Sequence, residues 1–157
     1  MPCDVIIYTD GASSGNPGPG GYGVVLISGQ HRKELSEGFK MTTNNRMELL
    51  AVIKGLEALK RPDCNVVLYT DSRYVVDAVT KGWLFGWEAK NFKGKKNPDL
   101  WKRFLKLYRS YRVSFQWVKG HANIAENERC DQLAVAAYKG TDLHIDEGYT
   151  VDFEQLI

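Results

Sequence analysis

Residues 66–71 read Val-Val-Leu-Tyr-Thr-Asp, and they nearly repeat residues 5–10, which read Val-Ile-Ile-Tyr-Thr-Asp. Short apolar runs rich in β-branched residues and stopped by a turn residue are typical of buried strands. Between the two runs, apolar residues follow the spacing of one helix face: Leu49, Val52, Ile53, Leu56 and Leu59. A strand, a helix and a second strand in this order predict two parallel strands joined by a helical crossover.

The helix between the two strands carries start and stop signals. Residues 42–45, Thr-Thr-Asn-Asn, supply candidates for the N-cap, and Asn45 with Glu48 three residues later resembles a capping box. Pro62 follows the apolar pattern, so we expect the helix to stop there.

The remaining segments complete a mixed sheet with helices on its faces. The glycine-rich residues 15–21 cannot form a helix, so the first strand and strands over 22–27 and 32–40 are expected to form an antiparallel meander. Further along, the patterns predict helices over 72–80, 98–111 and 126–138 and a strand over 113–118. We therefore predict an α/β fold with a five-stranded mixed sheet, three antiparallel strands followed by parallel ones.

Length and composition indicate one ordinary domain over residues 1–157, ending in an acidic tail over about 140–157. The three cysteines, Cys3, Cys64 and Cys130, are odd in number and scattered, so we expect reduced thiols, no disulfide and no zinc site. The sequence has no signal-peptide pattern and no apolar run long enough to span a membrane. These features predict a soluble, cytoplasmic protein.

Four carboxylates are expected to meet at one edge of the sheet. Asp10 and Asp71 end two parallel strands, and the helix that precedes the second strand returns its N-terminal turn, with Glu48, to the same edge. Asp131 lies within two turns of the start of the last helix, which follows another strand. Like charges this close repel one another unless a cation separates them, and oxygen ligands without cysteine or clustered histidine suit Mg²⁺, with Mn²⁺ as a second choice.

Each of these residues also has a purely structural interpretation. The two strand-end aspartates could be turn residues, Glu48 a partner in the helix cap, and Asp131 a solvated helix residue. His121 precedes the last helix and is expected at the same edge, where it could transfer protons, although a loop histidine is often simply exposed.

A basic segment lies between residues 81 and 112. It holds ten Lys or Arg and two acidic residues, a local net charge of +8 against −6 for the rest of the chain. Aromatic residues are interleaved with it: Trp83, Phe85, Trp87, Phe92 and Trp101. This combination favours contact with a phosphate backbone, while a solvated helix face with a few core aromatics is the alternative. An acidic metal edge beside it favours two-metal hydrolysis of a phosphodiester.

Five motifs closely resemble the bacterial type 1 ribonuclease H family and follow its order. They are 9–11 with 15–23, then 42–48, 69–72, 117–121 and 127–131, and the likeness extends from Val5 to about Tyr138. The resemblance implies the ribonuclease H-like fold and a monomeric, metal-dependent endonuclease. Such an enzyme hydrolyses the RNA strand of an RNA–DNA hybrid and leaves 3′-hydroxyl and 5′-phosphate ends.

The resemblance also implies residue roles. Asp10, Glu48, Asp71 and Asp131 would hold Mg²⁺, and His121 would assist proton transfer or product release. The positions expected to touch the hybrid are Gly11, Ser13, Asn16, Thr43, Asn44, Asn45, Arg73 and Asn97, and those of the family's basic protrusion, about residues 81–97, are Trp83, Trp87, Lys90, Lys93, Lys95 and Lys96.

Two departures from the family pattern and two alternative functions stay open. Arg73 stands where relatives often have glutamine, and the loop after His121 lacks a further glycine. The alternatives are a module that binds hybrid or structured nucleic acid without cleaving it, and a nuclease of the same fold that acts on DNA. The four carboxylates argue against the first alternative, and the Thr43-Asn44-Asn45 cluster with the basic segment argues against the second.

Overall fold

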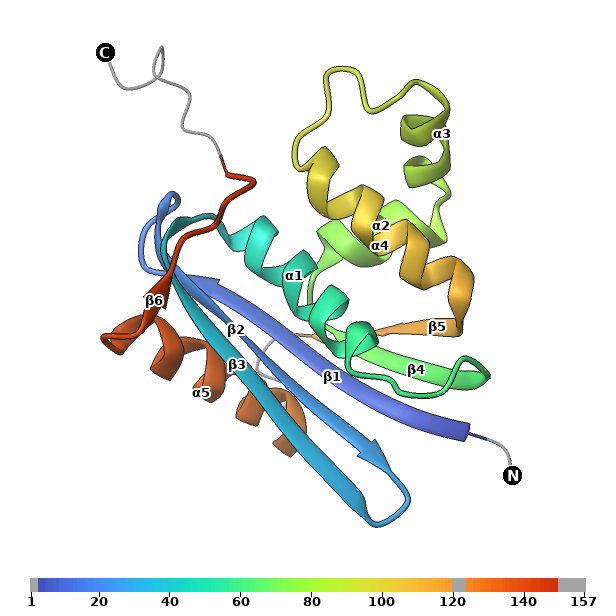
Figure 1. Ribbon diagram of the computed structural model, residues 1–157, viewed down its shortest axis with the longest axis horizontal. Coiled ribbons are helices and arrows are strands. Elements are labelled where there is room, and N and C mark those ends of the chain that lie inside the picture. The colour runs from blue at the N-terminus through green and yellow to red at the C-terminus, as the bar shows by residue number, and fades with distance from the viewer. Residues whose placement is uncertain (1–2, 120–123, 150–157) are drawn as a thin grey trace.

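A six-stranded mixed sheet forms the centre of the computed structural model, which describes residues 3–119 and 124–149 (Figure 1). Its strands are β1 (Cys3–Ser13), β2 (Gly18–Ser28), β3 (His31–Thr42), β4 (Cys64–Thr70), β5 (Arg112–Trp117) and β6 (Leu143–His144), in the order β5-β4-β1-β2-β3-β6. The first three strands are antiparallel, and β4 and β5 extend the sheet in parallel from β1. The predicted mixed sheet is confirmed, and the short β6, paired with β3, is one strand more than expected.

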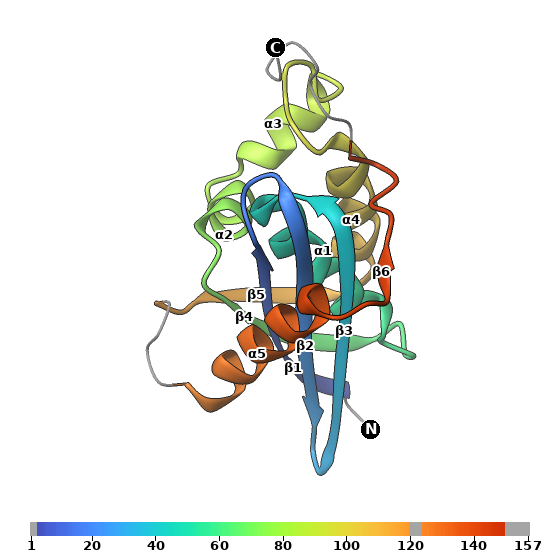
Figure 2. The ribbon, with the colours of Figure 1, turned by 90° about the vertical axis from the view of Figure 1, so that its left-hand side faces the viewer.

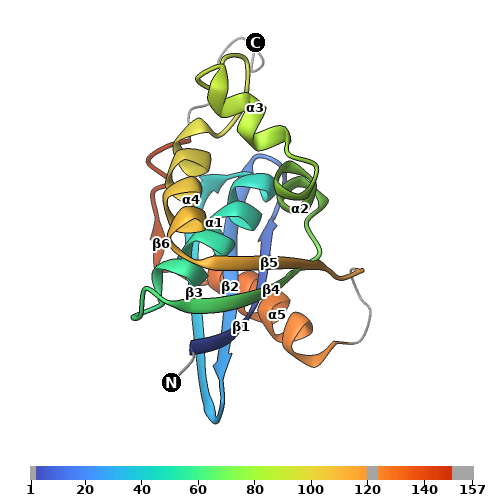
Figure 3. The same ribbon diagram turned by 90° about the vertical axis from the view of Figure 1, so that its right-hand side faces the viewer.

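Five helices lie within the described residues: α1 (Asn44–Glu57), α2 (Arg73–Thr80), α3 (Trp83–Ala89), α4 (Pro98–Ser110) and α5 (Ala125–Lys139). Figures 2 and 3, which view the molecule from opposite sides, show α1 and α4 on one face and α5 on the other. The sequence patterns did not predict α3. This helix and the loop that follows it stand at one end of the molecule, away from the sheet (Figure 1).

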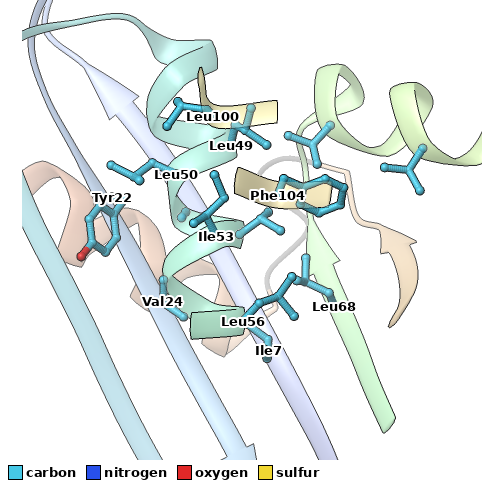
Figure 4. Close-up of a cluster of buried hydrophobic side chains, with 14 of the residues drawn as sticks. Ile7, Tyr22, Val24, Leu49, Leu50, Ile53, Leu56, Leu68, Leu100 and Phe104 are labelled. Atoms are coloured by element: carbon cyan, nitrogen blue, oxygen red, sulfur yellow. The ribbon is translucent and has the colours of Figure 1, made fainter. Parts of the chain in front are cut away.

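Helix α1 is the central element of the core. Its apolar side chains contact the sheet on one side and α4 on the other, as Figure 4 shows for Leu50 on the side of Tyr22 and Leu49 on the side of Leu100. The N-cap is Thr43, whose hydroxyl accepts a hydrogen bond from the Arg46 amide at 3.2 Å. The predicted capping box at Asn45 and Glu48 is wrong, because the helix starts earlier and the Glu48 side chain turns into the sheet edge instead.

The prediction about the cysteines needs a correction. Cys3 and Cys64 form a disulfide, because the parallel register of β1 and β4 sets these two residues opposite each other with their Cα atoms 4.5 Å apart. They are 61 residues apart in the sequence, so their spacing did not suggest the pair. Cys130 is a buried free thiol.

The described part of the acidic tail is attached to the core. Asp146 accepts hydrogen bonds from the Thr42 hydroxyl at 2.7 Å and from Nε of the buried Arg46 at 2.7 Å. Arg46 also binds Asp99 at the start of α4, so one guanidinium joins α1, α4 and the tail. None of the helices in the described ranges is both long enough and apolar enough to span a bilayer.

Candidate metal centre and nucleic-acid surface

The candidate centre lies at the C-terminal end of β4, where its pairing with β1 stops. Asp10 lies two residues beyond Tyr8, the last residue of β1 that pairs with β4, and Asp71 follows the last residue of β4. Each of Asp10, Glu48 and Asp71 offers a carboxylate oxygen, and these oxygens lie within 4.8 Å of one another. The predicted convergence of these three acids is therefore present in the structure.

Gly11 allows Glu48 to come this close. A Cβ atom at Gly11 would lie 2.3 Å from the Glu48 amide nitrogen, so only a residue without a side chain lets the first turn of α1 pack on β1. The Gly11 amide in turn donates a hydrogen bond of 2.9 Å to Oδ1 of Asp10.

Gly23 has the same function on the opposite face. It pairs with Asp10 across β1 and β2, and a Cβ atom there would lie 2.2 Å from the carbonyl oxygen of Cys130. Helix α5 can therefore lie directly against the sheet, which brings Asp131 to the cavity that Asp10 and Asp71 line. Asp131 is exposed and lies outside the tight group of three.

Burial and mutual repulsion change the ionisation of this cluster. Burial, followed by the charges of Asp71 and Asp131, raises the pKa of Asp10 to about 8. Burial, followed by the charges of Asp10 and Asp71, raises the pKa of Glu48 well above its ordinary value. Without a cation, the fold therefore holds the carboxyl groups of Asp10 and Glu48 where they keep their protons to a higher pH than exposed carboxyl groups do.

The residues present fit a hard divalent cation. Oε2 of Glu48 is buried and has no hydrogen-bond partner among the residues that the structure describes. A buried polar atom normally has such a partner, so this oxygen is open to one. The three ligand oxygens come from carboxylates alone, without histidine or cysteine, a donor set that suits Mg²⁺ or Mn²⁺. They line a cavity of about 410 Å³.

The same cavity holds residues that were not among the candidates. Asn127, Glu128 and Gln132 line it from α5, and the buried Asn127 side-chain oxygen has no hydrogen-bond partner. Asn127 and Glu128 precede Asp131 by four and three residues, which is the spacing of one side of a helix, so the position of Asp131 could have indicated these two. His121 lies outside the described residues.

Many of the residues expected to contact nucleic acid gather at a second, larger cavity of about 560 Å³. Those that line it are Asn16, Thr43, Asn45, Lys95, Lys96 and Asn97. Gly11 instead lines the acidic cavity, and Arg73 lies at the start of α2.

Hydrogen bonds fix several of these groups in place. The Ser13 hydroxyl donates to Oδ1 of Asn44 at 2.9 Å, and the Asn44 amide donates to Oδ1 of Asn16 at 3.2 Å. Asn97 accepts a hydrogen bond from Arg46 and donates one to the Tyr74 hydroxyl. The network around Arg46 therefore sets the orientation of one side of this cavity.

The aromatic part of the basic segment is only partly available. Trp83 is 49% exposed, with the Lys81 ammonium 5.1 Å from its ring centroid. Trp87 is half-buried and packs edge-on against Trp101. Trp101 and Phe92 are core residues, so the interpretation of all five aromatics as a surface series is wrong for these two.

Four exposed lysines remain around α3 and the loop that follows it, and we call them the lysine loop: Lys90, Lys93, Lys95 and Lys96. Within the described residues none of the four forms an ion pair, whereas Arg103 and Arg109 are each paired with a glutamate. The lysine loop therefore offers a ligand four positive charges that no acidic side chain of the described residues pairs with.

Comparison with known proteins agrees with this geometry. Residues 2–139 match the family model described as RNase H. The chain is 62% identical over 148 residues to the ribonuclease H of Desulforamulus reducens, covering 91% of this chain and 92% of that protein. LC9-RNase H1, described as a type 1 RNase H, superposes with a TM-score of 0.81 at 32% identity, covering 99% of this chain and 81% of that one. LC11-RNase H1, solved in complex with an RNA/DNA hybrid, superposes with a TM-score of 0.65 at 28% identity, covering 86% and 96%. The family model matches most of this chain, and the ribonuclease H of Desulforamulus reducens is 62% identical over 91% of it. The chain therefore belongs to the ribonuclease H family.

Proposed function

We propose that the chain hydrolyses the RNA strand of RNA–DNA hybrids with Mg²⁺ held by Asp10, Glu48, Asp71 and Asp131. The observation that carries this proposal is the group of three carboxylate oxygens within 4.8 Å, two of whose side chains have raised pKa values. A protein that only bound nucleic acid would gain nothing from acids that repel its ligand. Mn²⁺ is the alternative ion, because it accepts the same oxygen ligands.

When bound, the ions would supply Lewis-acid stabilisation for two-metal phosphodiester hydrolysis. The chain supplies the geometry. Asp10 is held by β1 and Glu48 by the N-terminal part of α1, just after its first turn, and the Gly11 amide orients the Asp10 carboxylate. Asp131 is exposed at the rim of the cavity, where it can adjust to the ligand. We assign to His121 assistance of proton transfer or of product release.

Hybrid recognition is proposed for the second cavity and the lysine loop. LC11-RNase H1, a relative of similar fold, was solved with an RNA/DNA hybrid bound. The short amides Asn16, Asn45 and Asn97 suit hydrogen bonds to the sugar edges of a minor groove, where RNA displays its 2′-hydroxyl groups. The lysine loop would bind the phosphates of the DNA strand. We also propose that the active form is a monomer.

A cleavage assay with three substrates tests the proposal. Purified protein receives end-labelled RNA–DNA hybrid, RNA duplex or DNA duplex of one sequence, with Mg²⁺, with Mn²⁺ or with chelator. We expect cleavage of the RNA strand of the hybrid alone, only with metal, with 5′-phosphate and 3′-hydroxyl ends. Cleavage of the DNA duplex would refute the specificity, and tight binding without cleavage in any metal would favour the binding module. Asp10→Asn is the matched inactive variant.

A further inference from the structure

Beside the acidic cavity, an arginine lies flat on a tryptophan ring. The Arg73 guanidinium carbon is 3.9 Å from the ring centroid of Trp117. Arg73 is the first residue of α2 and Trp117 is the last residue of β5, so the contact joins two elements that end at the same edge of the sheet. Both side chains are open to solvent, with Arg73 62% and Trp117 39% exposed.

Trp117 also contacts the chain at a candidate metal ligand. Its indole nitrogen donates a hydrogen bond of 3.1 Å to the backbone carbonyl oxygen of Asp71. One ring therefore holds the guanidinium on its face and the backbone of Asp71 at its edge. The position of Arg73 relative to the carboxylate cluster is set through this ring.

The guanidinium keeps its capacity to bind an anion. Its nearest carboxylate, Asp77, lies 4.0 Å away and is also within 3.7 Å of the Lys81 ammonium. A guanidinium stacked on an aromatic face still presents the N–H groups of its plane, and these match the oxygens of a phosphate in pairs. Holding the side chain on the ring also reduces the conformational entropy that binding would cost.

We propose that Arg73 and Trp117 form a phosphate subsite for the cleaved strand, with Arg73 as the binding group and Trp117 as its positioning residue. The inference rests on the proposed function, because the strand that is cut must pass over the acidic cavity. Its phosphates meet repulsion from the carboxylates there, and a fixed cation at the rim attracts the phosphate next to the scissile one.

Salt dependence of hybrid binding is the direct test. In the Asp10→Asn background, where the hybrid stays intact, Arg73→Gln should flatten the slope of log affinity against log salt by about 0.9, the value for one lost phosphate contact on a duplex. The matched control is Arg61→Gln, at the far end of β4 and paired with Asp63, which should leave the slope unchanged. An unchanged slope for Arg73→Gln would overturn the proposal.

Steady-state kinetics of hybrid cleavage, measured in the protein that retains Asp10, test the function of Trp117. Arg73→Gln should raise KM about fivefold with kcat within twofold, and Trp117→Leu should raise KM about threefold. The double variant should match Arg73→Gln in KM, because the ring acts on hybrid binding through the guanidinium. Trp117→Phe, which keeps an aromatic face, should restore most of the affinity. Multiplicative effects in the double variant, or no rescue by phenylalanine, would refute the positioning function.

These outcomes are distinguishable from failure of the proposed function itself. If the unmodified protein leaves the hybrid uncut with every metal, the proposed function fails whatever Arg73 does. If it cuts the hybrid and the Arg73 variants behave like the Arg61 control, only the subsite fails. Circular dichroism of each variant reports whether it folds. If Trp117→Leu does not fold, Trp117→Phe and Arg73→Gln together decide the test.

Discussion

Replacing Asp10 by asparagine should stabilise the metal-free protein while abolishing cleavage. Asp10 is 6% exposed, and its pKa is raised from 3.8 to about 8 by burial and by the neighbouring carboxylates. At neutral pH the unfolded chain has an ionised Asp10, whereas the folded chain must either protonate this group or accept a repelled, buried charge. Asparagine has the same shape and avoids both costs.

The size of the effect follows from the pKa difference. Because the folded-state pKa lies above the unfolded value, the folded protein holds a proton that the unfolded chain has lost, and stability falls as the pH rises from about 4 to about 8. Each pH unit in this window lowers the free energy of unfolding of the parent protein by about 1.4 kcal/mol. The variant should therefore gain up to about 4 kcal/mol over the parent at pH 7 and about 2 kcal/mol at pH 5. Imperfect hydrogen bonding of the amide will lower both values.

Urea unfolding in the presence of chelator, followed by circular dichroism at pH 5 and pH 7, measures this difference. Asp4→Asn is the control, because Asp4 is an exposed residue of the same strand and its replacement should change stability by less than about 0.5 kcal/mol. Saturating Mg²⁺ should reduce the difference in stability between Asp10→Asn and the parent protein, because the ion stabilises the parent more than a variant that lacks one ligand. If asparagine gives no gain at pH 7, or a gain that does not grow from pH 5, the carboxylates are not held together as argued.

Three further predictions concern other parts of the molecule. Asp146→Asn should cost about 3 kcal/mol in the free energy of unfolding, because it leaves the buried Arg46 with one carboxylate partner in place of two; urea unfolding measures it, and no loss would mean that the tail is not docked. Changing three residues of the lysine loop to glutamine should flatten the salt dependence of hybrid binding by two to three in slope and leave kcat largely unchanged; an unaltered slope would exclude the loop from binding. Replacing Cys3 and Cys64 by alanine should lower stability by about 4 kcal/mol, the entropy of closing a loop of this length, without loss of hybrid cleavage; equal stability of oxidised parent and variant would contradict the disulfide.

Local sequence patterns determined much of the fold of this protein and of its candidate metal centre. The repeated apolar runs that end in Asp10 and Asp71, with an amphipathic helix between them, were sufficient to predict two parallel strands and the edge where their acids meet. Glu48 followed because a crossover helix must return its N-terminus to that edge. These inferences succeed because side-chain periodicity and connection geometry act over short stretches of chain.

Contacts between distant segments were decided only by the tertiary structure. Gly11 and Gly23 are turn-like residues in the sequence, yet each permits a helix backbone to reach the sheet beside Asp10. The disulfide, the tail bound to Arg46 and the stacking of Arg73 on Trp117 depend on strand register and helix packing. Such pairings are set by how all the elements bury their surfaces together, a property of the whole chain that no local pattern records.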